Sequence, residues 1–218
     1  MNYDLVILTT ACSRSKLHTQ SLSNVPKLLD GYNCKWIIRV DHLKDEAVDN
    51  TIKNLNCILD SEHIDLQVVS SNRDAGRISW FKSVKWIINE GFKYKPKFGY
   101  FWLEDDWGFN TDKTLKSVLE NSNNTIPSEN FYISLAKRVE LSFNPCIWSP
   151  DLYEKYMYDK INNAVMPDNG GNAERACVYD NGSVISRVGI NFIKHNLFFD
   201  VGRQWAANNI NGKRTFYF

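Results

Sequence analysis

The sequence predicts an α/β protein with a mostly parallel central sheet flanked by helices. In the first half of the chain, short apolar runs alternate with longer amphipathic segments. Each apolar run ends in polar residues, and the most apolar one, residues 98–103, ends in three consecutive acids. Alternating strands and helices form βαβ units, which place parallel strands in one sheet and helices on both of its faces.

Four apolar runs in this half are predicted to be strands, and they cover residues 4–10, 35–40, 64–69 and 98–103. The last run has no polar interruption, which is typical of a strand buried on both faces. The polar residues 13–16 after the first run are expected to form a loop.

Helices are predicted between these strands. A short helix is expected over residues 25–29. Residues 44–59 and 75–89 each carry an apolar stripe with helical spacing, which is typical of an amphipathic helix packed on a sheet. The stripes consist of Val48, Ile52, Leu55 and Leu59 in the first segment and Trp80, Phe81, Val84, Ile87 and Ile88 in the second.

The alternation weakens in the second half of the chain. The pattern there predicts helices over residues 113–120, from Pro150 onwards and over 172–178, with a polar turn at 121–124. It predicts strands over residues 131–136 and 141–148 and a strand-like segment at 191–194, with further segments at 183–188 and 192–199. Residues 202–218 form a basic, aromatic tail.

Composition limits the classes of protein to consider. The chain has 218 residues, 43% of them hydrophobic, and a net charge of +1. We expect a single domain over residues 1–218. A net charge this small gives no overall field that would favour nucleic acid, so no nucleic-acid partner is expected.

Cysteine usage and hydropathy bear on location. The five cysteines are scattered and form no Cys-x-x-Cys pair, which fits a reducing compartment. No apolar segment approaches the length of a membrane span. We therefore expect a soluble, cytoplasmic protein.

Polar residues at the ends of the predicted strands suggest a ligand site. Carboxyl ends of parallel strands meet at one edge of a sheet, where α/β proteins bind their ligands. The residues brought to this edge are Thr9, Thr10, Asp41, Asn72, Arg73, Asp74, Glu104, Asp105 and Asp106. Three adjacent carboxylates repel one another unless a positive charge lies among them. A divalent cation with oxygen ligands, Mn²⁺ or Mg²⁺, would supply that charge.

These motifs resemble those of a known enzyme family. Glu104-Asp105-Asp106 at the end of a buried strand resembles the acidic DXD motif of the nucleotide-sugar-dependent glycosyltransferases with the GT-A fold. Residues 70–77 (Ser-Ser-Asn-Arg-Asp-Ala-Gly-Arg) resemble the family's segment upstream of that motif, and Val40-Asp41 resembles its second-strand aspartate. The resemblance covers residues 1–110 best and implies that they form the nucleotide-sugar-binding half, with residues 111–218 on the acceptor side.

The resemblance also implies roles for individual residues. Asp106 would be the metal ligand, with His195 completing the site. Glu104 and Asp105 would lie along the ribose and the donor sugar, and Asp41 would accept a hydrogen bond from the uracil of a UDP-sugar, the favoured donor. The basic candidates for phosphate or base contacts are Arg14, Arg73, Arg77, Lys82 and Arg203.

On the acceptor side, Gly170-Gly171-Asn172-Ala173-Glu174 resembles the glycine loop and acid of inverting members of the family. There, the acid deprotonates the acceptor, a saccharide or another hydroxyl-bearing molecule. Glu174 and Asp105 are therefore the catalytic candidates, with Asp168 as a rival for the base. The family's usual Glu-Asp doublet is missing here, so the stereochemical outcome stays open.

Each of these residues also has a simpler explanation. The three acids could favour the start of a following helix, as could Asp41 and Glu174. The basic residues could be solvated surface charges, and His195 a core or surface histidine. Two other functions also remain open. One is a sugar-phosphate nucleotidyltransferase, although residues 9–16 lack the glycine-rich loop that this class needs. The other is a non-catalytic carbohydrate- or nucleotide-binding protein with the same fold.

Overall fold

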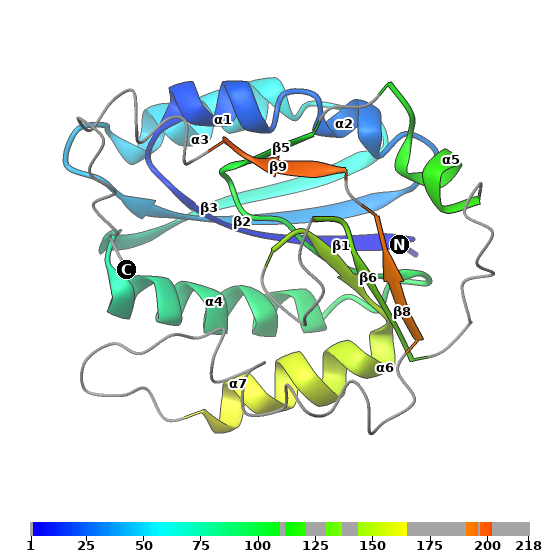
Figure 1. Ribbon diagram of the computed structural model, residues 1–218. Helices are drawn as coiled ribbons and strands as arrows, with labels where there is room; N and C mark the ends of the chain where they lie inside the picture. The colour runs from blue at the N-terminus through cyan, green and yellow to red at the C-terminus, as the bar shows by residue number, and fades with distance from the viewer. Residues whose placement is uncertain are drawn as a thin grey trace.

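A seven-stranded sheet forms the centre of the computed structural model, which describes residues 2–109, 112–120, 130–136, 144–164, 191–195 and 197–201. The strand order is β3-β2-β1-β4-β7-β6-β8 (Figure 1). The strands are β1 (Leu5–Cys12), β2 (Cys34–His42), β3 (Ile64–Asp74), β4 (Gly99–Trp102), β6 (Phe131–Ser134), β7 (Cys146–Trp148) and β8 (Asn191–Lys194). Only β7 runs antiparallel to its neighbours, so the sheet is mostly parallel, as the sequence predicted.

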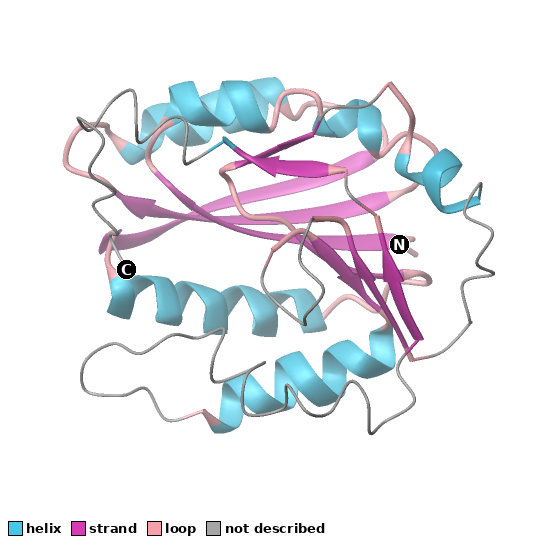
Figure 2. Ribbon diagram, viewed as in Figure 1, coloured by secondary structure: helices cyan, strands magenta, loops and turns pink. Residues whose placement is uncertain are grey.

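Helices cover both faces of this sheet (Figure 2). One face carries α1 (Ser15–Ser21), α2 (Val25–Leu28), α3 (Val48–Ile58) and α5 (Leu115–Glu120). The other face carries α4 (Arg77–Phe92) and a helical segment made of α6 (Pro150–Leu152), the π-helical turn η1 (Tyr153–Tyr158) and α7 (Asp159–Asn163). The predicted α/β architecture is therefore confirmed.

The core consists of two apolar clusters, one on each face of the sheet. Successive residues of a strand point to opposite faces, so β4 contributes to both clusters. Phe101 packs on the face of α1 to α3, whereas Tyr100 and Trp102 pack on the face of α4. All four residues of β4 are buried. This explains why the run before the acids contains no polar residue until its end.

Several element boundaries differ from the prediction. Residues 15–21 form helix α1 rather than continuing the loop expected at 13–16. The strand-like segment at 191–194 is confirmed as β8, and the segment over 192–199 contributes to two strands in different sheets. β8 joins the main sheet, and β9 (Phe198–Asp200) pairs with β5 (Trp107–Phe109), a strand that the sequence did not predict. Three residues are too short to show a strand pattern.

Helix α3 begins at Val48 rather than at residue 44, because residues 43–46 form a turn closed by a bridge between Leu43 and Glu46. The predicted elements at 121–124, 172–178 and 183–188 lie outside the described residues. In the part of the chain that the structure describes, no helix is both long and apolar enough to cross a membrane.

Gly99 provides a test of how tightly β4 packs against β7. A Cβ at this position would lie 2.6 Å from the carbonyl oxygen of Trp148 and 2.9 Å from Ile147 Cγ2. We expect Gly99→Ala to destabilise the protein by about 1–3 kcal/mol, because the backbone must shift to relieve the clash. Urea unfolding measures the change.

Gly76→Ala is the matched control, because a Cβ there meets no heavy atom within 4 Å and the backbone is extended. Its effect should stay within about 0.5 kcal/mol. Equal stability of the two variants would contradict the packing described for β4.

Candidate functional site

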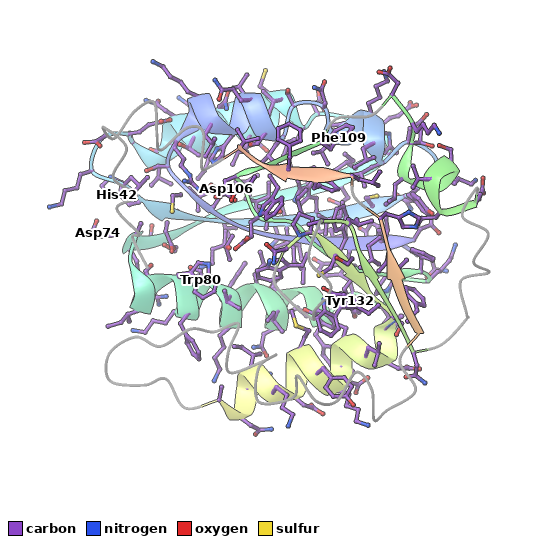
Figure 3. All side chains as sticks on the ribbon, viewed as in Figure 1. His42, Asp74, Trp80, Asp106, Phe109 and Tyr132 are labelled. Carbon is purple, nitrogen blue, oxygen red and sulfur yellow. The ribbon has the colours of Figure 1, made fainter. Side chains whose placement is uncertain are left out.

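The carboxyl ends of β1 to β4 lie on one side of the molecule, where the chain places most of the predicted site residues. Figure 3 shows His42 and Asp74 at the ends of β2 and β3, with Asp106 on the same side. The acidic motif begins at Glu104, two residues after β4 ends at Trp102. The parallel alignment of β1 with both β2 and β4 produces this convergence.

Asp105 is held by protein groups on both carboxylate oxygens. Arg14 donates from Nη2 to Oδ1 at 2.6 Å and from Nε to Oδ2 at 3.1 Å. The Cys12 backbone N–H also donates to Oδ2, at 3.1 Å, and His18 Nε2 lies 2.9 Å from the same oxygen. Asp105 is only 4% exposed. This environment is that of a buried ion pair, which makes Asp105 a poor candidate for a residue that faces the donor sugar.

The electrostatics of Asp105 follow from these contacts. Burial alone would raise the pKa of Asp105, because it disfavours the charged form. The charge of Arg14 and the hydrogen bond from His18 outweigh burial and hold the pKa of this carboxyl well below its usual range. Asp105 is therefore ionised at neutral pH, and Arg14 neutralises it.

Asp106 differs from its neighbour. Its side chain is 24% exposed, and Arg14 Nη2 lies 3.9 Å from its Oδ2, too far for a hydrogen bond. Burial raises the pKa of Asp106, Arg14 lowers it, and the charges of Asp105 and Asp200 raise it further. The net pKa lies above the usual value. Nearby positive charge therefore balances Asp106 only in part. Of the acids in the motif, Asp106 is the one whose ionised form a bound cation would stabilise most.

Asp200 is a site residue that the sequence analysis missed. Strand β9 pairs antiparallel with β5, with Asp200 opposite Trp107, and the Val201 N–H donates to the Asp106 carbonyl at 2.8 Å. The close approach depends on Gly108, where a Cβ would lie 2.8 Å from Val201 Cγ2. The sequence signal was an acid directly after the apolar pair Phe198-Phe199, but nothing in the sequence showed that β9 pairs next to the acidic motif.

His195 directly follows β8, which β7 and β6 separate from β4 in the main sheet. Its backbone N–H donates to the Ser134 carbonyl at 2.7 Å, and burial lowers the pKa of its ring with no carboxylate contributing. Within the described ranges, no group of three or more His, Cys, Asp or Glu side chains could hold a metal. The pairing of His195 with Asp106 therefore stays a prediction.

The remaining candidates on β1, β2 and β4 are largely occupied by protein partners. Thr9 Oγ1 accepts from Trp36 Nε1 at 2.9 Å inside the core, and Thr10 is buried. Asp41 Oδ1 accepts from Ser83 at 2.7 Å. The Glu104 carboxylate accepts from Trp107 Nε1 at 3.3 Å and is half-buried.

The end of β3 is the most open part of this edge. A hollow of about 480 Å³ lies there, lined by Asn72 and Arg73 together with His42, whose Nδ1 lies 3.0 Å from Asp74 Oδ1. Asn72 has a φ of 54°, a left-handed conformation that asparagine tolerates. Its N–H donates to Ser70 Oγ at 3.0 Å, which fixes the turn.

The structure describes only some of the basic and acceptor-side candidates. Arg73 and Lys82 are exposed at the end of β3 and on α4. Arg77 begins α4, but its side chain lies outside the described part of the structure, as do Arg203, Glu174 and Asp168.

The buried pair predicts a specific acid dependence of stability. The pKa of Asp105 is lower in the folded than in the unfolded protein, so its contribution is present above an unfolded pKa of about 3.9 and is lost as pH falls through the folded pKa. Asp105→Asn removes this contribution and leaves Arg14 without its hydrogen-bonded carboxylate, at a cost of about 3–5 kcal/mol near neutral pH.

We therefore expect the stability gap between wild type and Asp105→Asn to narrow by about 1 kcal/mol between pH 6 and pH 3. Urea unfolding at both pH values measures the gap. A gap independent of pH would show that Asp105 is not ionised in a buried pair.

Comparisons with known proteins were made by sequence and by structure. The sequence matches no protein family model and no curated protein. Among solved structures, the mannosyltransferase PcManGT from Pyrobaculum calidifontis, in complex with GDP-Man and Mn²⁺, matches with a TM-score of 0.57 at 10% identity, over 90% of this chain and 55% of that chain. TarS from S. aureus matches with a TM-score of 0.53 at 12% identity, over 97% of this chain and 40% of that chain.

A TarS structure of residues 1–349 gives a TM-score of 0.50 at 12% identity, over 97% of this chain and 66% of that chain. The present chain thus spans about half the length of the solved structures it matches. At these identities the similarity concerns the fold alone, since one fold hosts many functions. The chain has the GT-A fold, as its motifs predicted.

Proposed function

We propose that this chain is a metal-dependent glycosyltransferase, which moves a sugar from a nucleotide-sugar donor to an acceptor hydroxyl. The observation that carries the proposal is Asp106, a partly exposed carboxylate at the carboxyl end of β4 that lacks sufficient positive charge. Asp105 and Asp200 both raise its pKa, and Arg14 compensates only in part. A cation-binding acid at this edge of a GT-A sheet suits a donor that carries a diphosphate.

The residues present fit Mn²⁺ or Mg²⁺. Asp106 and Asp200 would offer two carboxylates, and such metals are usually held by one or two carboxylates together with substrate phosphates. When bound, the metal would neutralise the charge that develops on the nucleoside diphosphate as the bond to the sugar breaks. Arg14 pairs with Asp105, so it would help to neutralise the diphosphate only from a distance.

The donor would lie along the carboxyl ends of β2 and β3. The hollow there has Asn72 and Arg73 in its lining, and arginine pairs well with phosphate oxygens. In the described part of the chain, one oxygen of Asp41 accepts from Ser83. Asp41 is as buried as Asp105, at 3% exposed, but its second oxygen could accept the imide N–H of uracil, which is why we favour a UDP-sugar. PcManGT was solved with a GDP-sugar, so the base needs a direct test.

The remaining roles follow from this arrangement. Glu104 is the acid of the motif that remains to contact the donor, because Asp105 is buried. Glu174 is proposed as the base that deprotonates the acceptor, with Asp168 as the rival. We propose a single domain and a cytoplasmic location for the protein.

Calorimetry tests the donor and the metal together. Wild type should bind UDP or a UDP-sugar in the presence of Mn²⁺, more tightly than GDP or a GDP-sugar, and much more weakly without the metal. Asp106→Ala should abolish the part of the affinity that depends on Mn²⁺. If wild type binds no nucleoside diphosphate with Mn²⁺ present, the proposed function is wrong.

A second experiment separates the two candidates for the other protein ligand. Asp200→Asn should lower the affinity for Mn²⁺ about 10-fold or more, because the carboxylate whose charge acts on Asp106 is lost. His195→Ala is the comparison variant and tests the set predicted from sequence. Mn²⁺ titration monitored by electron paramagnetic resonance measures both. A large loss in His195→Ala with none in Asp200→Asn would restore the original assignment.

A further inference from the structure

One face of helix α1 is directed entirely at Asp105. Arg14 directly precedes the helix, and His18 and Ser21 follow it at spacings of four and three residues, which places all three on one side. Arg14 and His18 contact the Asp105 carboxylate, and Ser21 Oγ donates to the Asp105 carbonyl at 2.7 Å. Both the side chain and the backbone of Asp105 are therefore held by the same short helix.

These contacts are buried rather than superficial. His18 is fully buried, and Ser21 and Asp105 are 2% and 4% exposed. Within the described residues, Nδ1 of His18 has no hydrogen-bond partner, so the ring makes its hydrogen bond to Asp105 alone. Because a buried polar ring is costly unless it is bonded, this single bond to Asp105 determines how the ring is placed.

The other end of the same segment holds the turn that follows β2. The Leu43 N–H donates to Ser13 Oγ at 2.6 Å. The Ser15 N–H donates to Glu46 Oε2 at 2.9 Å, and the Ser15 hydroxyl also donates to Glu46. Residues 13–21, which we call the clasp, therefore join the β2–α3 turn to the acidic motif at the end of β4.

We propose that the clasp is a positioning device for the acidic motif, in which Arg14, His18 and Ser21 hold Asp105 inside the protein so that Asp106 is presented to the metal and donor. Asp105 and Arg14 are then positioning residues and do not touch the ligand. The inference rests on the proposed function, because it deepens the roles within the same site.

The different surroundings of the two neighbouring acids support this proposal. Asp105 is 4% exposed and has donors on both oxygens, whereas the Asp106 side chain is 24% exposed and lacks a bonded cation. The Val201 N–H donates to the Asp106 carbonyl at 2.8 Å. The backbone on both sides of the Asp106 side chain is thus anchored, by the clasp at Asp105 and by β9 at the Asp106 carbonyl.

A pair of substitutions at His18 distinguishes positioning from general stabilisation. His18→Gln keeps an N–H donor at nearly the reach of Nε2, whereas His18→Leu removes the donor but keeps an apolar group. Gly99→Ala serves as the control for a loss of global stability, since Gly99 lies at the amino end of β4, away from the acids.

Two measurements are made on each variant. The first is the affinity for Mn²⁺ in the presence of UDP. The second is amide hydrogen exchange without metal, at the Cys12 N–H that donates to Asp105 and at residues 103–107. We expect His18→Leu to weaken Mn²⁺ binding about 10-fold and to accelerate exchange at these amides. His18→Gln should restore most of the Mn²⁺ affinity and most of the protection from exchange. Gly99→Ala should change neither the Mn²⁺ affinity nor the exchange at these amides.

The proposal is overturned if His18→Leu leaves both measurements unchanged, or if His18→Gln is impaired as severely as His18→Leu. It is also overturned if Asp105→Asn remains folded and loses all Mn²⁺ binding as Asp106→Ala does, because Asp105 would then be a ligand. If wild type itself binds neither Mn²⁺ nor UDP, the proposed function fails, and the exchange measurement alone decides whether the clasp orders the motif.

Discussion

The ion pair between Arg14 and Asp105 is the interaction on which the candidate site depends. Consecutive acids at the end of a buried strand repel one another and lose hydration, so they need a positive charge close by. The protein supplies one itself, through a guanidinium with an N–H 2.6 Å from Asp105 and 3.9 Å from Asp106. The Arg14 guanidinium neutralises Asp105 fully and Asp106 only in part. The motif is thereby divided into a buried anchor and an acid that still favours a cation.

Segments that are distant in sequence create this difference between Asp105 and Asp106. Strand β1 brings Cys12 and Arg14 beside the end of β4, because the two strands are parallel neighbours. Helix α1 then packs against the acids, and the small sheet of β5 and β9, which lies against α1, brings Asp200 to the same motif. A GT-A sheet provides the edge, but the chemistry that we propose belongs to the side chains placed there.

The sequence was informative where a local pattern determines the outcome. The uninterrupted apolar run at 98–103 correctly indicated a strand buried on both faces, and the βαβ order correctly placed Asp41, Asn72 and the three acids at one edge. It did not show that Arg14 pairs with Asp105, and the role of Arg14 as a phosphate contact stays a prediction. Helix α1 was missed because its seven residues contain one large apolar side chain, Leu17, and therefore show no stripe.

The sequence by itself determined the α/β architecture, the buried strand and the presence of acids at its tip, because these follow from apolar periodicity and from the way parallel strands align. Only the tertiary structure decided which acid is neutralised and which remains short of charge. That choice depends on contacts between residues 91 and 87 positions apart, Arg14 and His18 with Asp105. It depends equally on a three-residue pairing that carries Asp200 to Asp106. Such partners are selected by packing, and no local pattern in the chain records them.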